Sequence, residues 1–205
     1  MLEKILKNLN FLVMCLCFCL LIAPTNTFAS TVIESNLNEE SEVIMRISGI
    51  NFNYKNAPEL ARYEHELNCE YIGISPADDD VIFIPVEGFE RYGISQEMRS
   101  GYDDYVISSS GDMIYIKNVL GSGSSYSVNK STLVGYNHVN RGEAVRCLQI
   151  FLNRFNNNLG LAVDGIFGSN THTQLIRFQS FANLSTDAIC GRNTWNAFLQ
   201  RYSGA

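Results

Sequence analysis

Histidine and cysteine are scarce in this chain of 205 residues, which has three histidines and six cysteines. Three of the cysteines lie within the first 20 residues, so that only Cys69, Cys147 and Cys190 remain further along the chain. Such a small and odd number excludes a disulfide scaffold. Cys147 and Cys190 could still pair with each other, although both also suit small, buried apolar positions.

Positive charge is scarce in the front part of the chain. Residues 30–137 hold 7 Lys and Arg against 17 Asp and Glu, a net charge of −10. Residues 138–205 hold 6 against 3, a net charge of +3. Because the acidic front part repels phosphate groups, nucleic acid is not an expected partner.

No apolar run is long enough to cross a bilayer as a helix, which takes roughly 20 residues. The longest, at residues 11–22, follows a basic start and precedes Thr-Phe-Ala at residues 27–29. This order is typical of a secretory signal peptide with cleavage after Ala29. A retained membrane anchor is the alternative. We therefore expect a secreted protein, with a signal peptide at residues 1–29 and a flexible N-terminus at residues 30–41.

A stretch rich in glycine and serine, GSGSSYS at residues 121–127, lies next to the change in charge. It indicates either a linker or a hairpin loop. The expected organisation is an acidic β-rich domain at residues 42–120, a linker at residues 121–134 and a helical domain at residues 135–203. The predicted fold class is α+β.

The front domain carries mostly β signals. Short β-branched or aromatic runs, separated by Asn, Gly, Asp and Ser, predict strands. The runs lie at residues 43–47, 50–54, 71–74, 81–86, 105–107 and 113–116. One helix is expected at residues 58–67, since Pro58 suits a first helical turn. Its apolar residues, Leu60, Tyr63 and Leu67, recur at helical spacing.

The turn DGIFGSNT at residues 164–171 returns as DAICGRNT at residues 187–194. In each copy the Asp carboxylate can cap nearby backbone N–H groups, and the Ile is an apolar anchor. The later Gly allows a close approach where a helix starts, and Asn or Thr can satisfy N–H groups of its first turn. The structural residues of the two corners are Asp164, Gly165, Ile166, Gly168, Thr171, Asp187, Ile189, Gly191 and Thr194. We expect both isoleucines to be largely buried, with helices at residues 142–155, 169–181 and 192–201.

The segments RGEAVRCLQIFLN, VDGIFGSNTHTQLIRFQ and TDAICGRNTW together resemble the peptidoglycan-binding domain family of bacterial cell-wall hydrolases and spore-cortex lytic enzymes. The resemblance covers residues 136–202 and departs from the family pattern at Ala188, where the family usually has Gly. It implies a non-catalytic module of three helices that holds its carrier on the cell wall. Peptidoglycan is then the expected partner, and another cell-wall protein could contact the front domain.

Most residues of the family pattern suit a structural role. The candidate ligand contacts are Arg177, Arg192 and Arg201, because a guanidinium group binds the carboxylates of stem peptides in a bidentate manner. Trp195 is either a core residue or a platform for a sugar or a peptide.

The front domain shows little catalytic chemistry. Its only histidine, His65, lies four residues before Cys69, which suits half of a metal site or a Cys–His dyad. No further histidine there completes a zinc site, and no His-Glu-x-x-His, amidase or transpeptidase motif occurs. The acidic run at residues 78–80 indicates a solvated turn, with a calcium site as the alternative. We therefore expect no catalytic residue, no metal and no cofactor.

The sequence thus predicts a secreted, cell-wall-associated protein. It binds peptidoglycan through the C-terminal helical domain and presents the β-rich domain. The alternative is a small peptidoglycan hydrolase, because glycoside hydrolysis needs only two carboxylates that face one cleft. The front domain offers many carboxylates for that pair, namely Asp78, Asp79, Asp80, Asp103, Asp104 and five glutamates. The glutamates, which are the residues to substitute in a test, are Glu64, Glu66, Glu70, Glu87 and Glu90.

Overall fold

The front of the described chain holds five strands with one α-helix after the first of them, and three α-helices follow. The computed structural model describes residues 42–95, 101–156 and 160–203, so the predicted signal peptide and the segment at 30–41 lie outside the described residues. The strands are β1 (Glu42–Asn53), β2 (Val81–Pro85), β3 (Asp103–Ser110), β4 (Met113–Leu120) and β5 (Tyr126–Asn129). The α-helices are α3 (Glu59–Tyr71), α4 (Glu143–Phe155), α5 (Ser169–Phe181) and α6 (Arg192–Tyr202). None of these helices is long and apolar enough to cross a membrane.

The strands form one antiparallel sheet in the order β2-β1-β3-β4-β5. Side chains of a strand alternate between the two faces of its sheet, and β4 shows the pattern clearly. Ile114 and Ile116 are fully buried, whereas Tyr115 and Lys117 between and after them are only half-buried. The α+β fold class predicted from the sequence is confirmed.

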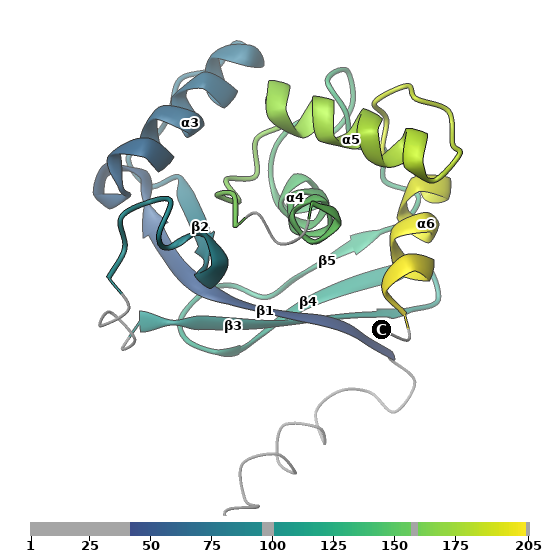
Figure 1. The fold of residues 1–205 in the computed structure, drawn as a ribbon, viewed down its shortest axis with the longest axis horizontal. Helices are drawn as coiled ribbons and strands as arrows, with labels where there is room; N and C mark the ends of the chain where they lie inside the picture. Colours follow the sequence, from purple (N-terminus) through teal and green to yellow (C-terminus); the bar gives the residue numbers. More distant parts are fainter. Residues whose placement is uncertain (1–41, 96–100, 157–159, 204–205) are drawn as a thin grey trace, which may run out of the picture. The chain divides into compact units, whose positions relative to one another are not determined.

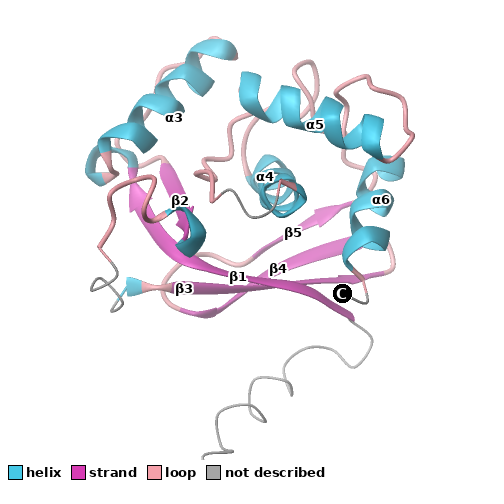
Figure 2. Cartoon of the chain, in the orientation of Figure 1, coloured by secondary structure: helices cyan, strands magenta, loops and turns pink. Residues whose placement is uncertain are grey.

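The helices lie on one face of this sheet, with α4 between the sheet and α5 (Figures 1 and 2). One apolar cluster joins residues of both halves of the chain, among them Ile107 and Ile114 from the sheet and Leu148 and Phe151 from α4. The three C-terminal helices therefore share a core with the strands that precede them. Residues 40–205 accordingly make up a single unit.

The segment expected as a linker, residues 121–134, contributes to this unit. It contains β5, which pairs with β4 over four residues. Its Val128 and Val134 are buried in the shared core. The alternative reading of the Gly/Ser-rich stretch, a hairpin loop, describes what connects β4 to β5.

Three of the strand predictions need correction. Residues 71–74 are not a strand, because α3 continues to Tyr71 and Ile72 caps its C-terminus. The reason is burial, since Cys69 extends the buried face of α3 that Ala61 and His65 begin. Residues 43–47 and 50–54 were expected as separate strands but belong almost entirely to one, β1.

The three C-terminal helices agree with the expected ranges to within one residue. Ile166 is buried as expected, but Ile189 is only half-buried. The residue after each isoleucine is fully buried instead, Phe167 in the first corner and Cys190 in the second. The deep anchor of each corner is therefore one position later than the repeat indicated.

The described cysteines are all free and buried. The possible pair between Cys147 and Cys190 is therefore not formed, and both residues pack in the apolar core. This agrees with the alternative interpretation of these cysteines as small apolar residues.

Candidate functional site

A glutamine of the preceding helix organises the first corner. The Gln149 side chain donates to Asp164 Oδ1 at 2.8 Å and to the Ile166 carbonyl at 3.1 Å, and it accepts from the Gly165 N–H at 2.9 Å. The Asp164 Oδ1 atom also accepts from the Ile166 N–H at 2.9 Å. The carboxylate thus caps its own turn, as expected for an Asp at this position.

The second corner repeats this network with Gln179. Its side chain donates to Asp187 Oδ1 at 2.8 Å and to the Ile189 carbonyl at 3.0 Å, and it accepts from the Ala188 N–H at 3.0 Å. The Ile189 N–H donates to Asp187 Oδ1 at 2.9 Å. The repeated turn is therefore a shared structural device that includes the glutamine before it.

The helices after the corners begin without a side-chain cap. Gly168 and Gly191 occupy the N-cap positions of α5 and α6, and neither helix shows a side-chain hydrogen bond there. Since glycine has no side chain, capping by Asn or Thr of the turn would have to come from within the first helical turn, and it stays a prediction. Thr171 instead lies within hydrogen-bond distance of Gln149, whose Nε2 atom donates to its hydroxyl at 3.3 Å.

The second oxygen of Asp164 connects the first corner to α3. Asp164 Oδ2 lies 3.1 Å from His65 Nδ1 and accepts from the Asn68 side chain at 2.8 Å. Asp164 is buried, and Asp187, its counterpart in the second corner, is exposed. Of the two matching aspartates, Asp164 therefore links the C-terminal part of the chain to α3 in the front part.

His65 lies at the centre of a small polar cluster. Its ring is buried, and its Nε2 atom is 2.9 Å from Asp80 Oδ2 and 3.5 Å from Cys69 Sγ. Burial alone lowers the pKa of His65, but the hydrogen bonds to Asp164 and Asp80 outweigh it and raise the pKa above its usual value. Burial and the nearby carboxylates raise the pKa of the Cys69 thiol to about 12.

Asp80 completes this cluster from the loop before β2. Its Oδ2 atom also accepts a hydrogen bond from the Ala77 N–H at 2.8 Å. Partial burial raises the pKa of Asp80, but the hydrogen bonds from Ala77 and His65 dominate and hold it below its usual value. Asp78 and Asp79 are exposed, so only the last residue of the acidic run takes part.

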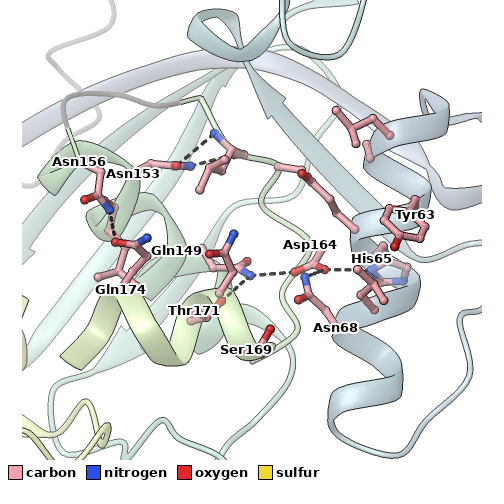
Figure 3. A pocket seen from close by; sticks show the side chains of 18 residues that line it. Tyr63, His65, Asn68, Gln149, Asn153, Asn156, Asp164, Ser169, Thr171 and Gln174 are labelled. Atoms are coloured by element: carbon pink, nitrogen blue, oxygen red, sulfur yellow. Dashed lines mark hydrogen bonds and ion pairs between the residues drawn. The ribbon is translucent and has the colours of Figure 1, made fainter. Parts of the chain in front are cut away.

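A cavity of about 300 Å³ opens beside this cluster, between α3 on one side and α4 with the start of α5 on the other (Figure 3). Six amide side chains, three hydroxyl-bearing side chains, two carboxylates and one imidazole belong to its wall. They are those of Asn68, Gln149, Asn153, Asn156, Asn170, Gln174, Tyr63, Ser169, Thr171, Glu64, Asp164 and His65. No Lys or Arg is among the described residues that line it.

The apolar part of the cavity wall comes from the stripe that predicted α3. Leu60, Tyr63 and Leu67 are 39%, 55% and 46% exposed, and all three line the cavity. The opposite face of α3, with Ala61 and Cys69, packs in the interior. The sequence signal for this site is the apolar stripe of α3. The structure adds that the other face of α3 is the one that packs in the interior.

The predicted ligand contacts lie elsewhere. Arg177 is exposed on α5, and the Arg201 guanidinium lies over the Phe181 ring at 4.6 Å from its centroid. Arg192 binds the Asp112 carboxylate in a bidentate manner. None of the three lines the cavity.

Trp195 needs a correction as a candidate contact. Its ring is fully buried, and its Nε1–H donates to the Thr132 carbonyl at 3.1 Å. A buried ring offers no face to a ligand, so the alternative interpretation as a core residue holds. Thr132 lies in the segment expected as a linker, and its position could not be foreseen from helical periodicity.

The carboxylates considered for hydrolysis do not gather in the cavity. Of the five glutamates, only Glu64 lines it, and its oxygens accept hydrogen bonds from Arg91 and from the Tyr92 hydroxyl. Glu66 accepts from Tyr54. The other three, Glu70, Glu87 and Glu90, are exposed.

Two family models match the chain, each described as a putative peptidoglycan-binding domain. One covers residues 44–119, and the other covers residues 141–198. The two matched segments lie close to the two domains expected from the sequence. The cavity has one wall in each segment, because α3 belongs to the first and α4 and α5 to the second.

A solved structure is also similar, that of a peptidoglycan-binding protein from Clostridioides difficile in complex with glutamine hydroxamate. It is 29% identical in sequence with a TM-score of 0.66, and the alignment covers 77% of this chain and 95% of that chain. The similarity therefore extends over both matched segments. Both matched segments are thus similar to peptidoglycan-binding domain families, and the resemblance seen in the C-terminal motifs is confirmed.

Proposed function

We propose that this protein is secreted, associates with the cell wall and binds peptidoglycan in the cavity between α3 and α4. The observation that carries the proposal is the cavity itself, whose two walls come from the two matched segments. Its volume of about 300 Å³ is at the lower end of small-molecule sites. It suits a ligand part of amino-acid size, such as one residue of a stem peptide.

The wall chemistry favours a ligand rich in amide groups. Amide side chains both donate and accept hydrogen bonds, and six of them line the cavity. The apolar stripe of α3 faces them and supports an aliphatic chain, as Leu60 and Leu67 offer exposed apolar surface. A γ-linked or amidated glutamate residue combines an aliphatic chain with amide groups in this way.

The start of α5 supplies donors for a carboxylate. Ser169, Asn170 and Thr171 form its first turn and line the cavity. Backbone N–H groups in the first turn of a helix lack partners within the helix, and they attract anions. A carboxylate can thus be bound here without the arginines that the sequence suggested.

The similar protein from Clostridioides difficile supports a ligand of this class. Glutamine hydroxamate is an amino acid whose side chain ends in an amide-like group, and it is bound by that protein. At 29% identity over 77% of this chain, a related ligand is a reasonable expectation for this cavity. The sequence predicted that the front domain is only presented at the cell wall. In this proposal the front segment also forms one wall of the binding site.

The test is a substitution that fills the cavity. Asn170 is exposed at its rim, so that Asn170→Trp should block the cavity without disturbing the core. We expect at least about a 10-fold loss of affinity, equivalent to 1.4 kcal/mol, for glutamine hydroxamate in calorimetric titration. Sedimentation of the mature protein with purified, insoluble peptidoglycan should fall in parallel.

A matched control and a competing site make the result decisive. Ser124→Trp adds the same ring in the exposed loop between β4 and β5, away from the cavity, and should leave both measurements unchanged. The variants Arg177→Ala and Arg201→Ala test the arginine surface. Full binding by Asn170→Trp together with lost sedimentation of an arginine variant would reject the cavity as the site.

A further inference from the structure

We propose that His65, Cys69 and Asp80 form a binding site for a divalent transition-metal ion, with zinc(II) as the best match. The site lies behind the cavity, where α3 meets the loop before β2. Its Cys69 and Asp80 ligands do not line the cavity, whereas His65 lies in the wall between the two sites. The sequence showed only the first two ligands, and the fold adds the third.

The two distances from His65 Nε2 to the other ligand atoms are close to those in a zinc site. The imidazole nitrogen, the thiol sulfur and a carboxylate oxygen all lie within 4.8 Å of one another. In a tetrahedral site with bonds of about 2.0–2.3 Å, the ligand atoms are about 3.3–3.7 Å apart. The 3.5 Å between His65 Nε2 and Cys69 Sγ already meets this requirement, and the 2.9 Å to Asp80 Oδ2 needs only a small opening.

The orientation of His65 also suits metal binding. Histidine ligands of metals usually donate the other ring N–H to a carboxylate, which fixes the tautomer and the ring orientation. Asp164 Oδ2 lies 3.1 Å from His65 Nδ1, so that Nε2 is directed at Cys69 and Asp80. Asn68 in turn donates to the same Asp164 oxygen and holds it in place.

Ligand type and charge point to the same class of ion. Thiolate and imidazole ligands select zinc and similar transition metals over calcium and magnesium, which prefer oxygen. Two carboxylates, Asp80 and Asp164, flank His65 and supply negative charge for a cation. The Cys69 thiol releases its proton to solvent as the sulfur–metal bond forms, because the thiolate is the ligand.

The site has a path to solvent and room for a fourth ligand. His65 and Cys69 are buried, but the Asp80 side chain is 34% exposed. An ion can therefore enter beside Asp80, and a water molecule can complete the coordination there. Bound metal would join α3 to the loop before β2 and hold His65 against Asp164, which lines the cavity.

The test uses cobalt(II) as a spectroscopic probe, followed by zinc(II). Titration of the reduced, mature protein with cobalt(II) should produce a thiolate-to-cobalt charge-transfer band, and zinc(II) should displace the cobalt and remove the band. The melting temperature should rise with zinc(II) and return on addition of a chelator. No thiolate band with a folded protein would overturn the proposal.

The variants separate this site from incidental metal binding. Cys69→Ala should abolish the band, and Asp80→Asn should lower the cobalt affinity by at least about 10-fold, because even the loss of an outer-shell partner typically costs that much. Asp79→Asn changes the adjacent exposed carboxylate and should bind as the unmodified protein does. Should Cys69→Ala fail to fold, Asp80→Asn decides the question, because its side chain is partly exposed. Unchanged affinity in Asp80→Asn would reject the site.

Discussion

The two copies of the repeated turn share a backbone network but differ in what surrounds them. In both, a glutamine of the preceding helix joins the Asp carboxylate to the backbone of the next two residues. In the first copy the free oxygen of Asp164 is bound by His65 and Asn68 of α3. In the second copy Asp187 is exposed, and no described contact of that kind joins it to another element.

The same turn therefore has a structural role in both copies, and in the first copy it also contacts α3 beside the cavity. The first corner receives α3 so closely that a Cβ atom on Gly168 would lie 1.7 Å from Asn68 Oδ1. At Gly191, the matching position, the nearest heavy atom would be Leu133 Cδ2 at 3.0 Å. The cavity and the histidine cluster are both found at the first corner, where α3 packs against Asp164 and Gly168.

The largest expected effect concerns the part that both copies share. Gln149→Ala and Gln179→Ala should each lower the free energy of unfolding by about 3 kcal/mol, since each leaves buried backbone groups without a partner. Urea denaturation in the presence of a chelator measures both. A loss at Gln149 alone would mean that the second network contributes no stability and that the two corners are not equivalent.

The second prediction concerns the part that differs. Asp164→Asn keeps the oxygen that caps the turn but places an NH₂ group against Asn68 and His65, and should cost about 2 kcal/mol. Asp187→Asn makes the same change at an exposed position and should cost less than about 0.5 kcal/mol. The same denaturation assay applies, and equal losses would contradict the special role of the first corner.

The third prediction uses the departure from the family pattern at Ala188. Gly165 and Ala188 hold matching positions and both have positive φ, +74° and +55°. Gly165→Ala should cost about 1–2 kcal/mol, because a Cβ is strained there and would also approach Arg146 to 3.0 Å. Ala188→Gly should raise the free energy of unfolding by up to about 1 kcal/mol as that strain is relieved. A destabilised Ala188→Gly protein would show that the left-handed conformation carries no cost at this corner.

The smallest effect is expected at the start of α6. Arg192 and Asp112 form an ion pair in which both side chains are about half exposed, and such pairs contribute little to stability. Arg192→Gln should therefore leave the urea midpoint unchanged, at low salt as well as at high salt. A salt-dependent loss of stability would instead indicate that this pair fastens α6 to the loop between β3 and β4.

The sequence predictions that the structure confirms rest on patterns within short stretches of the chain. The α+β class and the three C-terminal helices follow from the periodicity of apolar residues and from short turn signals. The repeated turn was visible because its requirements, an Asp, a flexible second residue and a Gly before the helix, fall within eight residues. Helices and tight turns depend on interactions between residues that are close in sequence. They can therefore be predicted from a short stretch of sequence.

Burial was harder to foresee than secondary structure. Trp195 is a core residue because Thr132 and the aromatic cluster of α4 and α6 enclose it, and that enclosure depends on packing. Leu60, Tyr63 and Leu67 formed the apolar stripe that predicted α3, yet they line a cavity. Periodicity shows which residues share a helix face but does not show what lies opposite that face.

The sequence indicated parts of the cavity and of the histidine cluster, but only the tertiary structure brought those parts together. His65 and Asp164 are 99 positions apart, and Asp80 reaches His65 from a loop that neither helix periodicity nor turn signals place. Which of two matching aspartates meets α3 depends on how the helices pack on the sheet, and the repeat by itself treats the two alike. The sequence by itself determined the two corners and the helices they start. Long-range packing of the shared core then placed the first corner, with Asp164, against α3 as part of the candidate site. The second corner, with Asp187, has only a structural role.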